Sequence, residues 1–437
     1  MKPVTIPATL FRTNRERLRR LLLPNSIAVL NANDILPTNA DGTMEYVPNA
    51  DLFYLAGIAQ EETVLVIAPQ AIEEKNREVL FLREPSKLLS TWEGHKLTIE
   101  EARRISGIEN IQPLADLRGL FHALMCDADH VFLNSNEHYR AVVAVQSRDA
   151  RFIRDCQRRY PLHQYHRLAQ LMHELRVVKS PFEIDLIQQA SAITGAGFRR
   201  VLRFVKPGVN EAEIEAEFAH EFIRRRASFA YQPIIAAGTN NCVLHYHQND
   251  QVCRKGELVL LDVAAGYGNY LSDLTRTIPV SGRFTRRQKR VYQAVLRVFR
   301  QIVRGMVPGK TIRDLRQEAE CLLEQECVDL GLIKASQVSR RNPDNPPVKP
   351  YFMHGVSHPI GLDVHDVLYV QQKIQPGWVL TCEPAIYINK EGFGVRLENT
   401  IQVTENGQTD LMADIPIEAD EIEALMQDHG GARLRRG

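Results

Sequence analysis

The sequence predicts an α/β domain over residues 1–175, followed by an α+β domain over residues 176–437 built on an antiparallel sheet. In the first half, short apolar runs alternate with amphipathic segments, which is the pattern of α/β domains. A helix-start signal at 179–183 marks the boundary. In the second half, two pairs of carboxylates flank tight-turn signals, and this arrangement predicts antiparallel hairpins.

The composition is that of an ordinary globular chain. Its 437 residues give room for two to three domains, and 44% are hydrophobic and 24% charged. The net charge of +1 gives no reason to expect a nucleic-acid partner. Seven cysteines without a C-x-x-C pair favour a reducing, cytoplasmic setting. No signal-peptide core and no apolar run of ~18 residues are found, so no membrane association is expected.

In the first half, the alternation predicts strands at 26–30, 63–69, 78–83 and 130–134, and helices at 97–105 and 166–178. At the boundary, Ser180 suits an N-cap, Pro181 the first helical position and Glu183 the reciprocal capping-box position. The apolar stripe of this helix ends at Pro207-Gly208.

In the second half, Asn210, Thr285 and Thr311 are expected to cap further helices. Strands are expected near 233–236, 258–264 and 271–280, with three more around Glu383 and Glu398 and a last helix at 419–427. Strands and helices alternate here, but the predicted hairpins make the sheet antiparallel.

The two carboxylate pairs are mirrored about turns. Asp262 and Asp273 flank the turn signal at 266–269, and Glu383 and Glu398 flank the one at 389–392. Mirrored residues of a regular hairpin lie opposite each other on one face, with Cβ atoms ~5 Å apart. Carboxylates that close require a proton or a cation. A lone pair of this kind is usually a solvated turn, but two pairs predict a cluster of metal ions.

A nitrogen ligand is expected from residues 351–366, which contain His354, His358 and His365. Gly355 and Pro359 argue against a helical H-E-x-x-H motif, because proline disfavours helical backbone at the residue before it. Four carboxylates and one imidazole favour Mn²⁺, with Co²⁺, Fe²⁺ or Zn²⁺ as alternatives. Two such ions would acidify a water molecule at neutral pH, so metal-assisted hydrolysis is predicted.

Several segments resemble one family. The stretches at 260–277, 353–366, 381–388 and 394–400 have the order and context found in the pita-bread metallopeptidases, which include aminopeptidase P, prolidase and methionine aminopeptidase. Residues 49–58, 62–69 and 179–194 extend the resemblance, which is greatest to aminopeptidase P and covers nearly the whole chain. It implies a pita-bread catalytic domain at 176–437 behind an aminopeptidase P-like N-terminal domain at 1–175.

The resemblance also implies roles for particular residues. Two divalent ions, expected to be Mn²⁺, would be held by five ligands, namely Asp262, Asp273, His358, Glu383 and Glu398, with Asp273 and Glu398 bridging. The implied catalytic residues are His245 at the scissile amide, His354 on the proline side, His365 at the substrate carbonyl, Glu383 as proton shuttle and Arg396 near the far end of the substrate. A structural role for each histidine and for Arg396 is the competing interpretation. Trp92 resembles a tryptophan that reaches the active site of another subunit, which implies a homo-oligomer, a dimer or a tetramer.

The expected function is therefore removal of the N-terminal residue from peptides with proline at the second position. An Xaa-Pro dipeptidase (prolidase) is the alternative, because spacing does not show whether the site is open beyond the proline. A rival from another class is a non-catalytic binding protein of the same fold. The presence of all five ligands weighs against that rival, and the large N-terminal domain weighs against methionine aminopeptidase.

Overall fold

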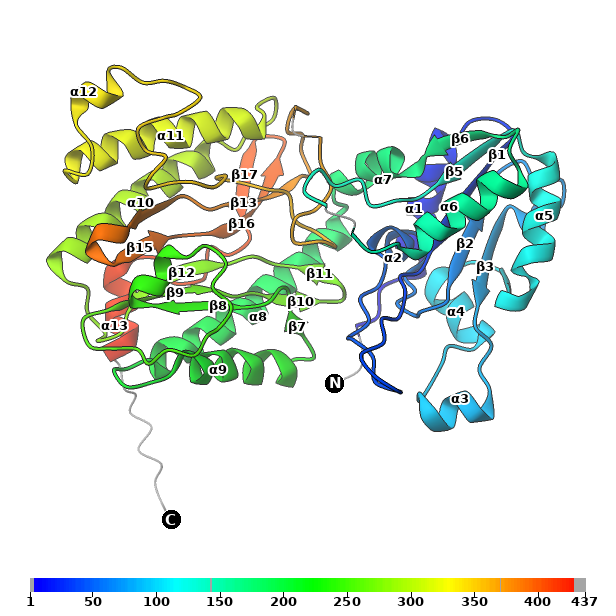
Figure 1. Ribbon diagram of the computed structural model, residues 1–437, viewed down its shortest axis with the longest axis horizontal. Helices are drawn as coiled ribbons and strands as arrows, with labels where there is room; N and C mark the ends of the chain where they lie inside the picture. Colours follow the sequence, from blue (N-terminus) through cyan, green and yellow to red (C-terminus); the bar gives the residue numbers. More distant parts are fainter. Residues whose placement is uncertain (1–3, 142–143, 370, 428–437) are drawn as a thin grey trace, which may run out of the picture. The chain divides into compact units, whose positions relative to one another are not determined.

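The computed structural model describes residues 4–141, 144–369 and 371–427. Among the described residues the chain forms two compact units, one made by Thr5–Arg176 and the other by Val4 together with residues 177–369 and 371–427 (Figure 1). Each unit has its own apolar core. In the described part of the chain, no helix is both long enough and apolar enough to cross a lipid bilayer.

The N-terminal unit is built on a six-stranded sheet with the order β4-β3-β2-β1-β5-β6. Its strands are β1 (Ser26–Asn31), β2 (Val64–Ile67), β3 (Glu78–Leu82), β4 (Asn110–Pro113), β5 (His130–Leu133) and β6 (Gln164–Arg167). The sheet is mixed, since β2 is antiparallel to β1 and β3 while β1, β5 and β6 run parallel. The predicted strands at 26–30, 63–69, 78–83 and 130–134 match β1, β2, β3 and β5. These strands are buried on both faces of the sheet, and a strand buried in this way has a continuous apolar run that is visible in the sequence.

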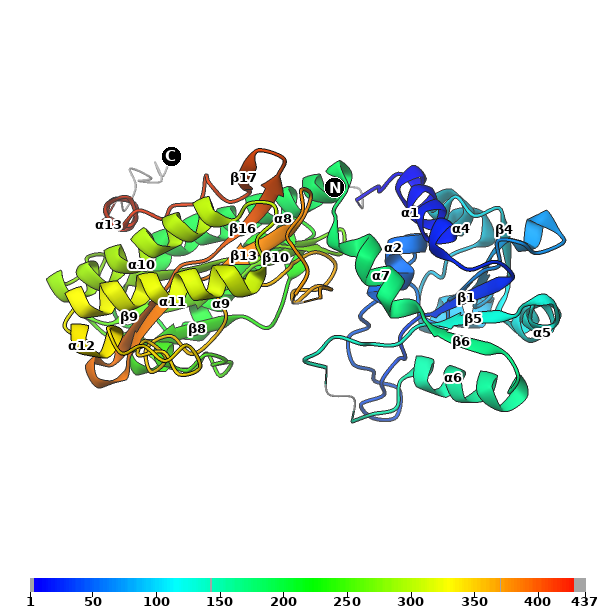
Figure 2. The same cartoon turned by 90° about the horizontal axis from the view of Figure 1, so that it is seen from above.

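Helices cover both faces of this sheet. They are α1 (Ala8–Leu21), α2 (Ala50–Ala56), α3 (Lys87–Trp92), α4 (Ile99–Ser106), α5 (Leu117–Asp127), α6 (Arg148–Arg159) and α7 (Leu168–Val177). Figure 2 shows α1, α2 and α4 on one side and α6 on the other. Apolar residues of α5 and α6, among them Phe121, Met125 and Cys156, pack on the second side. Helix α3 differs from the others because it has no buried residue.

The C-terminal unit places antiparallel strands between two helix pairs (Figure 1). The helices are α8 (Pro181–Phe204), α9 (Glu211–Arg224), α10 (Arg286–Gly305), α11 (Ile312–Asp329), the short α12 (Ala335–Val338) and α13 (Ala419–Gln427). The strands are β7 (Ser228–Phe229), β8 (Ile234–Ala237), β9 (Leu258–Asp262), β10 (Ala265–Tyr267), β11 (Tyr270–Leu271), β12 (Thr275–Pro279), β13 (Val379–Cys382), β14 (Ala385–Ile388), β15 (Phe393–Arg396), β16 (Asn399–Thr404) and β17 (Gly407–Asp410). This is the predicted α+β architecture.

Local signals start the four long helices. Ser180, Asn210, Thr285 and Thr311 each cap the first turn, and the residue three positions later completes a capping box. These are the four N-caps that the sequence predicts.

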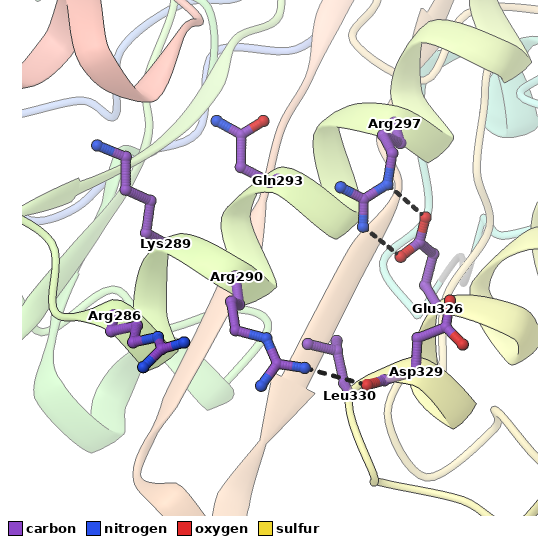
Figure 3. A pocket seen from close by; sticks show the side chains of 8 residues that line it. All are labelled: Arg286, Lys289, Arg290, Gln293, Arg297, Glu326, Asp329 and Leu330. Atoms are coloured by element: carbon purple, nitrogen blue, oxygen red, sulfur yellow. Dashed lines mark hydrogen bonds and ion pairs between the residues drawn. The ribbon is translucent and has the colours of Figure 1, made fainter.

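A surface pocket of about 430 Å³ lies between α10 and α11 (Figure 3). Its charges are largely paired, since Arg297 binds Glu326 through two nitrogens and Arg290 donates to the backbone carbonyl of Asp329.

The register of the first hairpin differs from the prediction. Asp262 pairs with Thr275, so Asp273 lies two residues from the position opposite Asp262. The cause is the turn, whose central residues are Gly268 and Asn269, both in the left-handed region with φ of 60° and 65°. A two-residue type I′ turn requires left-handed backbone at both central positions, and glycine and asparagine adopt it at low cost. The prediction centred the turn one residue too early.

The second hairpin has the predicted register. Cys382 pairs with Asn399 and Ala385 pairs with Arg396, so Glu383 and Glu398 occupy mirrored positions. Four strands, β13 to β16, surround these glutamates, where the sequence predicts three. The difference arises because each arm of the hairpin is interrupted at its glutamate, which divides both arms into two short strands.

Candidate metal centre

Four of the five candidate ligands, the carboxylates, lie at or next to strand ends in the C-terminal unit. Asp262 is the last residue of β9, and Asp273 precedes β12. Glu383 directly follows β13, Glu398 directly precedes β16, and His358 lies in the segment before β13. Strand ends leave side chains unconstrained by the ladder while the neighbouring strands fix their backbone, a favourable place for ligands.

The two hairpins are joined at the centre by Thr275 and Glu398. The amide of Glu398 donates to the carbonyl of Thr275 (3.0 Å), and the Thr275 hydroxyl donates to Glu398 Oε2 (2.6 Å). The buried guanidinium of Arg276 also donates to the carbonyl oxygens of Thr275 (2.9 Å) and Glu398 (2.8 Å). These contacts fix Glu398 beside the strand that follows Asp273.

His358 is oriented by its neighbours in the chain and by β13. Its amide donates to the Thr381 hydroxyl (3.0 Å), and Nδ1–H donates to the carbonyl of Pro359 (3.0 Å). The other ring nitrogen, Nε2, therefore faces the carboxylates, 3.5 Å from Asp273 Oδ2 and 3.7 Å from Glu383 Oε1. Ligand atoms that sit 2.0–2.2 Å from one ion are about 3–4 Å apart, so these spacings suit ligands of a shared ion.

Ligand atoms of three buried side chains converge here. One atom from each of Asp273, His358 and Glu398 lies within 4.8 Å of the other two. Burial raises the pKa of Asp273 well above its usual range, and the charge of Asp262 raises it further. Burial and the charge of Asp273 raise the pKa of Glu398 in the same way. The protein alone therefore disfavours these carboxylates in their charged form, whereas a bound cation would favour it.

Tyr231 joins the two aspartates, and sequence reasoning missed it. Its hydroxyl oxygen lies 2.6 Å from Asp262 Oδ1 and 2.6 Å from Asp273 Oδ1. A hydroxyl donates one proton, so the second short contact requires a proton on a carboxyl group or a cation nearby. Burial and the two aspartates raise the pKa of Tyr231, which keeps it a donor. The local sequence around Tyr231 does not predict its contacts with Asp262 and Asp273, because these contacts depend on the register of the hairpin.

A chain of hydrogen bonds runs from Asp262 to His354. Arg396 binds Asp262 Oδ2, and its Nη1 donates to the Tyr387 hydroxyl oxygen (2.8 Å). His354 Nδ1–H donates to the carbonyl of Gly355 (2.7 Å), so Nε2 accepts from Tyr387 (3.0 Å). Burial, and after it the charge of Arg396, lower the pKa of His354 to about 3. His354 is therefore neutral, and its Nδ1 lies 3.4 Å from Glu383 Oε2.

The remaining predicted residues lie at the outer side of the cluster. His365 is exposed, and its ring centre is 4.1 Å from that of His358 with the planes at 42°. His245 is also exposed and stacks on His247 with ring centres 6.1 Å apart. The charge of His245 contributes to the low pKa of His354, which places it near the cluster.

The donor set fits divalent metal ions. Four carboxylates and one imidazole are hard oxygen and borderline nitrogen donors, which Mn²⁺, Co²⁺, Fe²⁺ and Zn²⁺ all accept. Asp262, Asp273, Glu383 and Glu398 carry four formal negative charges, and Arg396 supplies one positive charge in ion-pair contact with Asp262. Divalent cations would remove the excess negative charge and the need for carboxyl protons.

Comparison with known proteins identifies the family of the chain. Residues 185–405 match metallopeptidase family M24, and residues 11–132 match the aminopeptidase P N-terminal domain. The Xaa-Pro aminopeptidase of Escherichia coli K12 is 33% identical over 433 residues, which is 95% of this chain and 97% of that protein. The structure of aminopeptidase PepP from Pseudomonas aeruginosa matches with a TM-score of 0.88 at 29% identity, over 97% of this chain and 98% of that one. E. coli aminopeptidase P with the inhibitor Pro-Leu matches with a TM-score of 0.85 at 31% identity, over 97% and 99% of the two chains.

Proposed function

Because the chain belongs to metallopeptidase family M24 and carries an aminopeptidase P N-terminal domain, it is a metalloaminopeptidase, and we propose that it releases the N-terminal residue of peptides with proline at position two. The observation that carries the proposal is the convergence of Asp273, His358 and Glu398 within 4.8 Å at a strand junction that also holds Asp262 and Glu383. The catalytic unit would be two divalent ions, and the oxygen-rich donor set favours Mn²⁺.

In this proposal each residue has a defined task. Asp262, Asp273, His358, Glu383 and Glu398 would hold the two ions. When bound, the ions supply an acidified water and polarise the scissile carbonyl. Glu383 moves the proton toward the leaving nitrogen, and His365 donates a hydrogen bond to the oxyanion. His245 binds the scissile amide, and neutral His354 lines the proline side of the site.

Arg396 and Tyr387 support this site by holding Asp262 and His354. The Arg396 side chain is buried, and its Nε, Nη1 and Nη2 donate to Thr275, Tyr387 and Asp262. This bears on the choice between the two peptidase classes. A dipeptidase must bind the free carboxylate of its proline with a nearby cation. Arg396 is already committed to protein oxygens, which supports a site that accepts a further residue after proline.

We expect tripeptides Xaa-Pro-Xaa to be cleaved with kcat/KM at least equal to that of Xaa-Pro dipeptides, releasing the first residue. The measurement is product analysis with Mn²⁺-loaded protein, with Xaa-Ala-Xaa peptides as the control for proline selectivity. Cleavage of dipeptides with refusal of every longer peptide would establish the prolidase alternative. Binding of peptides without any cleavage would favour the non-catalytic rival.

We also propose that the protein is a homo-oligomer, at least a dimer, in a cytoplasmic setting. The described cysteines are all free thiols, which supports a reducing compartment. Leu88 and Trp92 of α3 are 69% and 78% exposed, and aromatic side chains such as that of Trp92 are enriched at protein interfaces.

Trp92→Ala is expected to shift the protein toward smaller assemblies, because it removes the largest apolar side chain of α3. Light scattering at assay concentration measures the change. Tyr139→Ala, at a 65% exposed aromatic outside α3, is the matched control. A fully active wild-type monomer would contradict the proposed assembly.

A further inference from the structure

A buried ion pair joins the start of the C-terminal unit to the residue after His365. Lys179 Nζ lies 2.9 Å from Asp366 Oδ2, and the two side chains are 2% and 1% exposed. Lys179 comes directly before the N-cap of α8, and its amide donates to the carbonyl of Gly377 (2.8 Å). The backbone of Lys179 is therefore anchored, so its side chain can hold Asp366 in a defined position.

Asp366 closes a short loop, which we call the histidine loop and define as residues 359–366. Its amide donates to the carbonyl of Pro359 (3.0 Å), so the two ends of the loop meet. Oδ1 of Asp366 accepts from the amide of Val367 (2.9 Å), and Oδ2 accepts from Lys179 (2.9 Å). Both carboxylate oxygens thus have donors, as a buried charge requires.

Two histidines of the proposed site flank this closure. His358 directly precedes the loop and His365 is its penultimate residue, and their ring centres are 4.1 Å apart. The loop is packed tightly on the ion pair. A Cβ at Gly361 would lie 2.2 Å from Asp366 Oδ2 and 2.8 Å from Lys179 Cε. The amide of Leu271, in the first hairpin, donates to the carbonyl of Gly361 (2.8 Å).

Stability alone does not explain this pair. Two charges taken out of water lose hydration that their attraction only partly restores, so an apolar pair of similar size is often as stable. An apolar pair would not orient the loop. The directional contact with Lys179 fixes the orientation of the Asp366 carboxylate, and with it the backbone of the adjacent His365.

We propose that Lys179 and Asp366 are positioning residues that hold His365 beside His358 at the metal centre. The inference rests on the proposed function in one respect, namely that His365 acts on the substrate. It adds a long-range link between the segment before α8 and the catalytic histidine. A displacement of about 1 Å in such a group can lower turnover by about 100-fold.

The test uses the double variant Lys179→Met/Asp366→Leu, which leaves no unpaired buried charge. We expect kcat on Xaa-Pro-Xaa tripeptides to fall about 10-fold or more, with KM and the number of bound Mn²⁺ ions nearly unchanged. Lys179→Arg keeps the charge pair and should retain most of kcat. Glu324→Gln, which breaks the ion pair between Arg341 and the buried Glu324 of α11 (3.1 Å), is the matched control and should leave kcat unchanged.

A double-mutant cycle with His365→Ala separates positioning from a general structural effect. If the pair acts through His365, the apolar double variant should change kcat less than about 2-fold in the His365→Ala background. An equal loss of kcat in both backgrounds, or no loss in the wild-type background, would overturn the inference.

Hydrogen exchange of the amides at 360–367 provides a readout that does not depend on turnover. The apolar double variant should exchange faster in this segment, while the helix that follows Thr285 keeps its protection. Unchanged protection would overturn the inference whatever the activity. Failure of the wild-type protein to cleave any Xaa-Pro peptide would instead count against the proposed function.

Discussion

Asp273→Asn and Glu398→Gln are each expected to abolish peptide hydrolysis and to lower the metal content below that of the wild-type protein. Both side chains are buried at the centre of the cluster, 4% and 2% exposed, and each would be shared by two ions. Loss of an outer-shell partner typically costs about 10–100-fold in metal affinity, and loss of a shared ligand should exceed that. The measurements are metal analysis after gel filtration and turnover of an Xaa-Pro-Xaa tripeptide.

The amide substitutions preserve side-chain volume, so the fold should persist. Glu324→Gln is again the matched control, because it removes the charge of a carboxylate that is 1% exposed but distant in sequence from every proposed ligand. It should keep both ions and normal turnover. Normal metal content and normal turnover in either ligand variant would show that the assignment of the site is wrong.

Removal of metal should lower the melting temperature of the protein. An ion that binds only the native state stabilises it by about 2.7 kcal/mol at 100 times its dissociation constant, which for a unit of this size is about 5–10 °C. Thermal melting after chelation and after return of Mn²⁺ measures the shift. Mg²⁺ at the same concentration is the control for general ionic effects.

The loss of melting temperature on metal removal should also become larger as the pH rises. Asp273 and Glu398 have pKa values raised by burial in the protein without cations, whereas in the unfolded chain they titrate near 3.9 and 4.3. Between those ordinary values and the raised ones the native state holds protons that the unfolded state lacks, so rising pH destabilises the metal-stripped protein. The difference in melting temperature between metal-loaded and metal-stripped protein therefore grows as the pH rises above the ordinary carboxyl values. Equal melting curves, with binding to the native protein shown independently, would contradict this coupling.

Much of the fold follows from local signals. Ser180, Asn210, Thr285 and Thr311 lie at capping-box positions that are read directly from the sequence, and each starts a long helix. The prediction did not include α6, because its sequence RDARFIRDCQRR presents few apolar residues and only Cys156 is buried. It also did not include α3, which buries nothing and so has no apolar stripe.

The site could be predicted less completely, for a physical reason. The carboxylates and histidines are visible as residue types near turns, but their contacts depend on register and on residues distant in sequence. Because the turn is centred on Gly268 and Asn269, Asp273 does not lie opposite Asp262. Tyr231, which precedes β8, bridges the two aspartates through its hydroxyl group. Arg276 and Lys179 act on partners far along the chain, and no local pattern announces such pairs.

The central claim is that two metal ions held by these ligands hydrolyse Xaa-Pro bonds. Its most direct test is titration of metal-stripped protein with Mn²⁺ while release of the first residue from an Xaa-Pro-Xaa tripeptide is followed. We predict no turnover without metal and a plateau of activity at two bound ions per chain. Full turnover by the stripped protein, or a plateau reached with no ion bound at the centre, would contradict the claim.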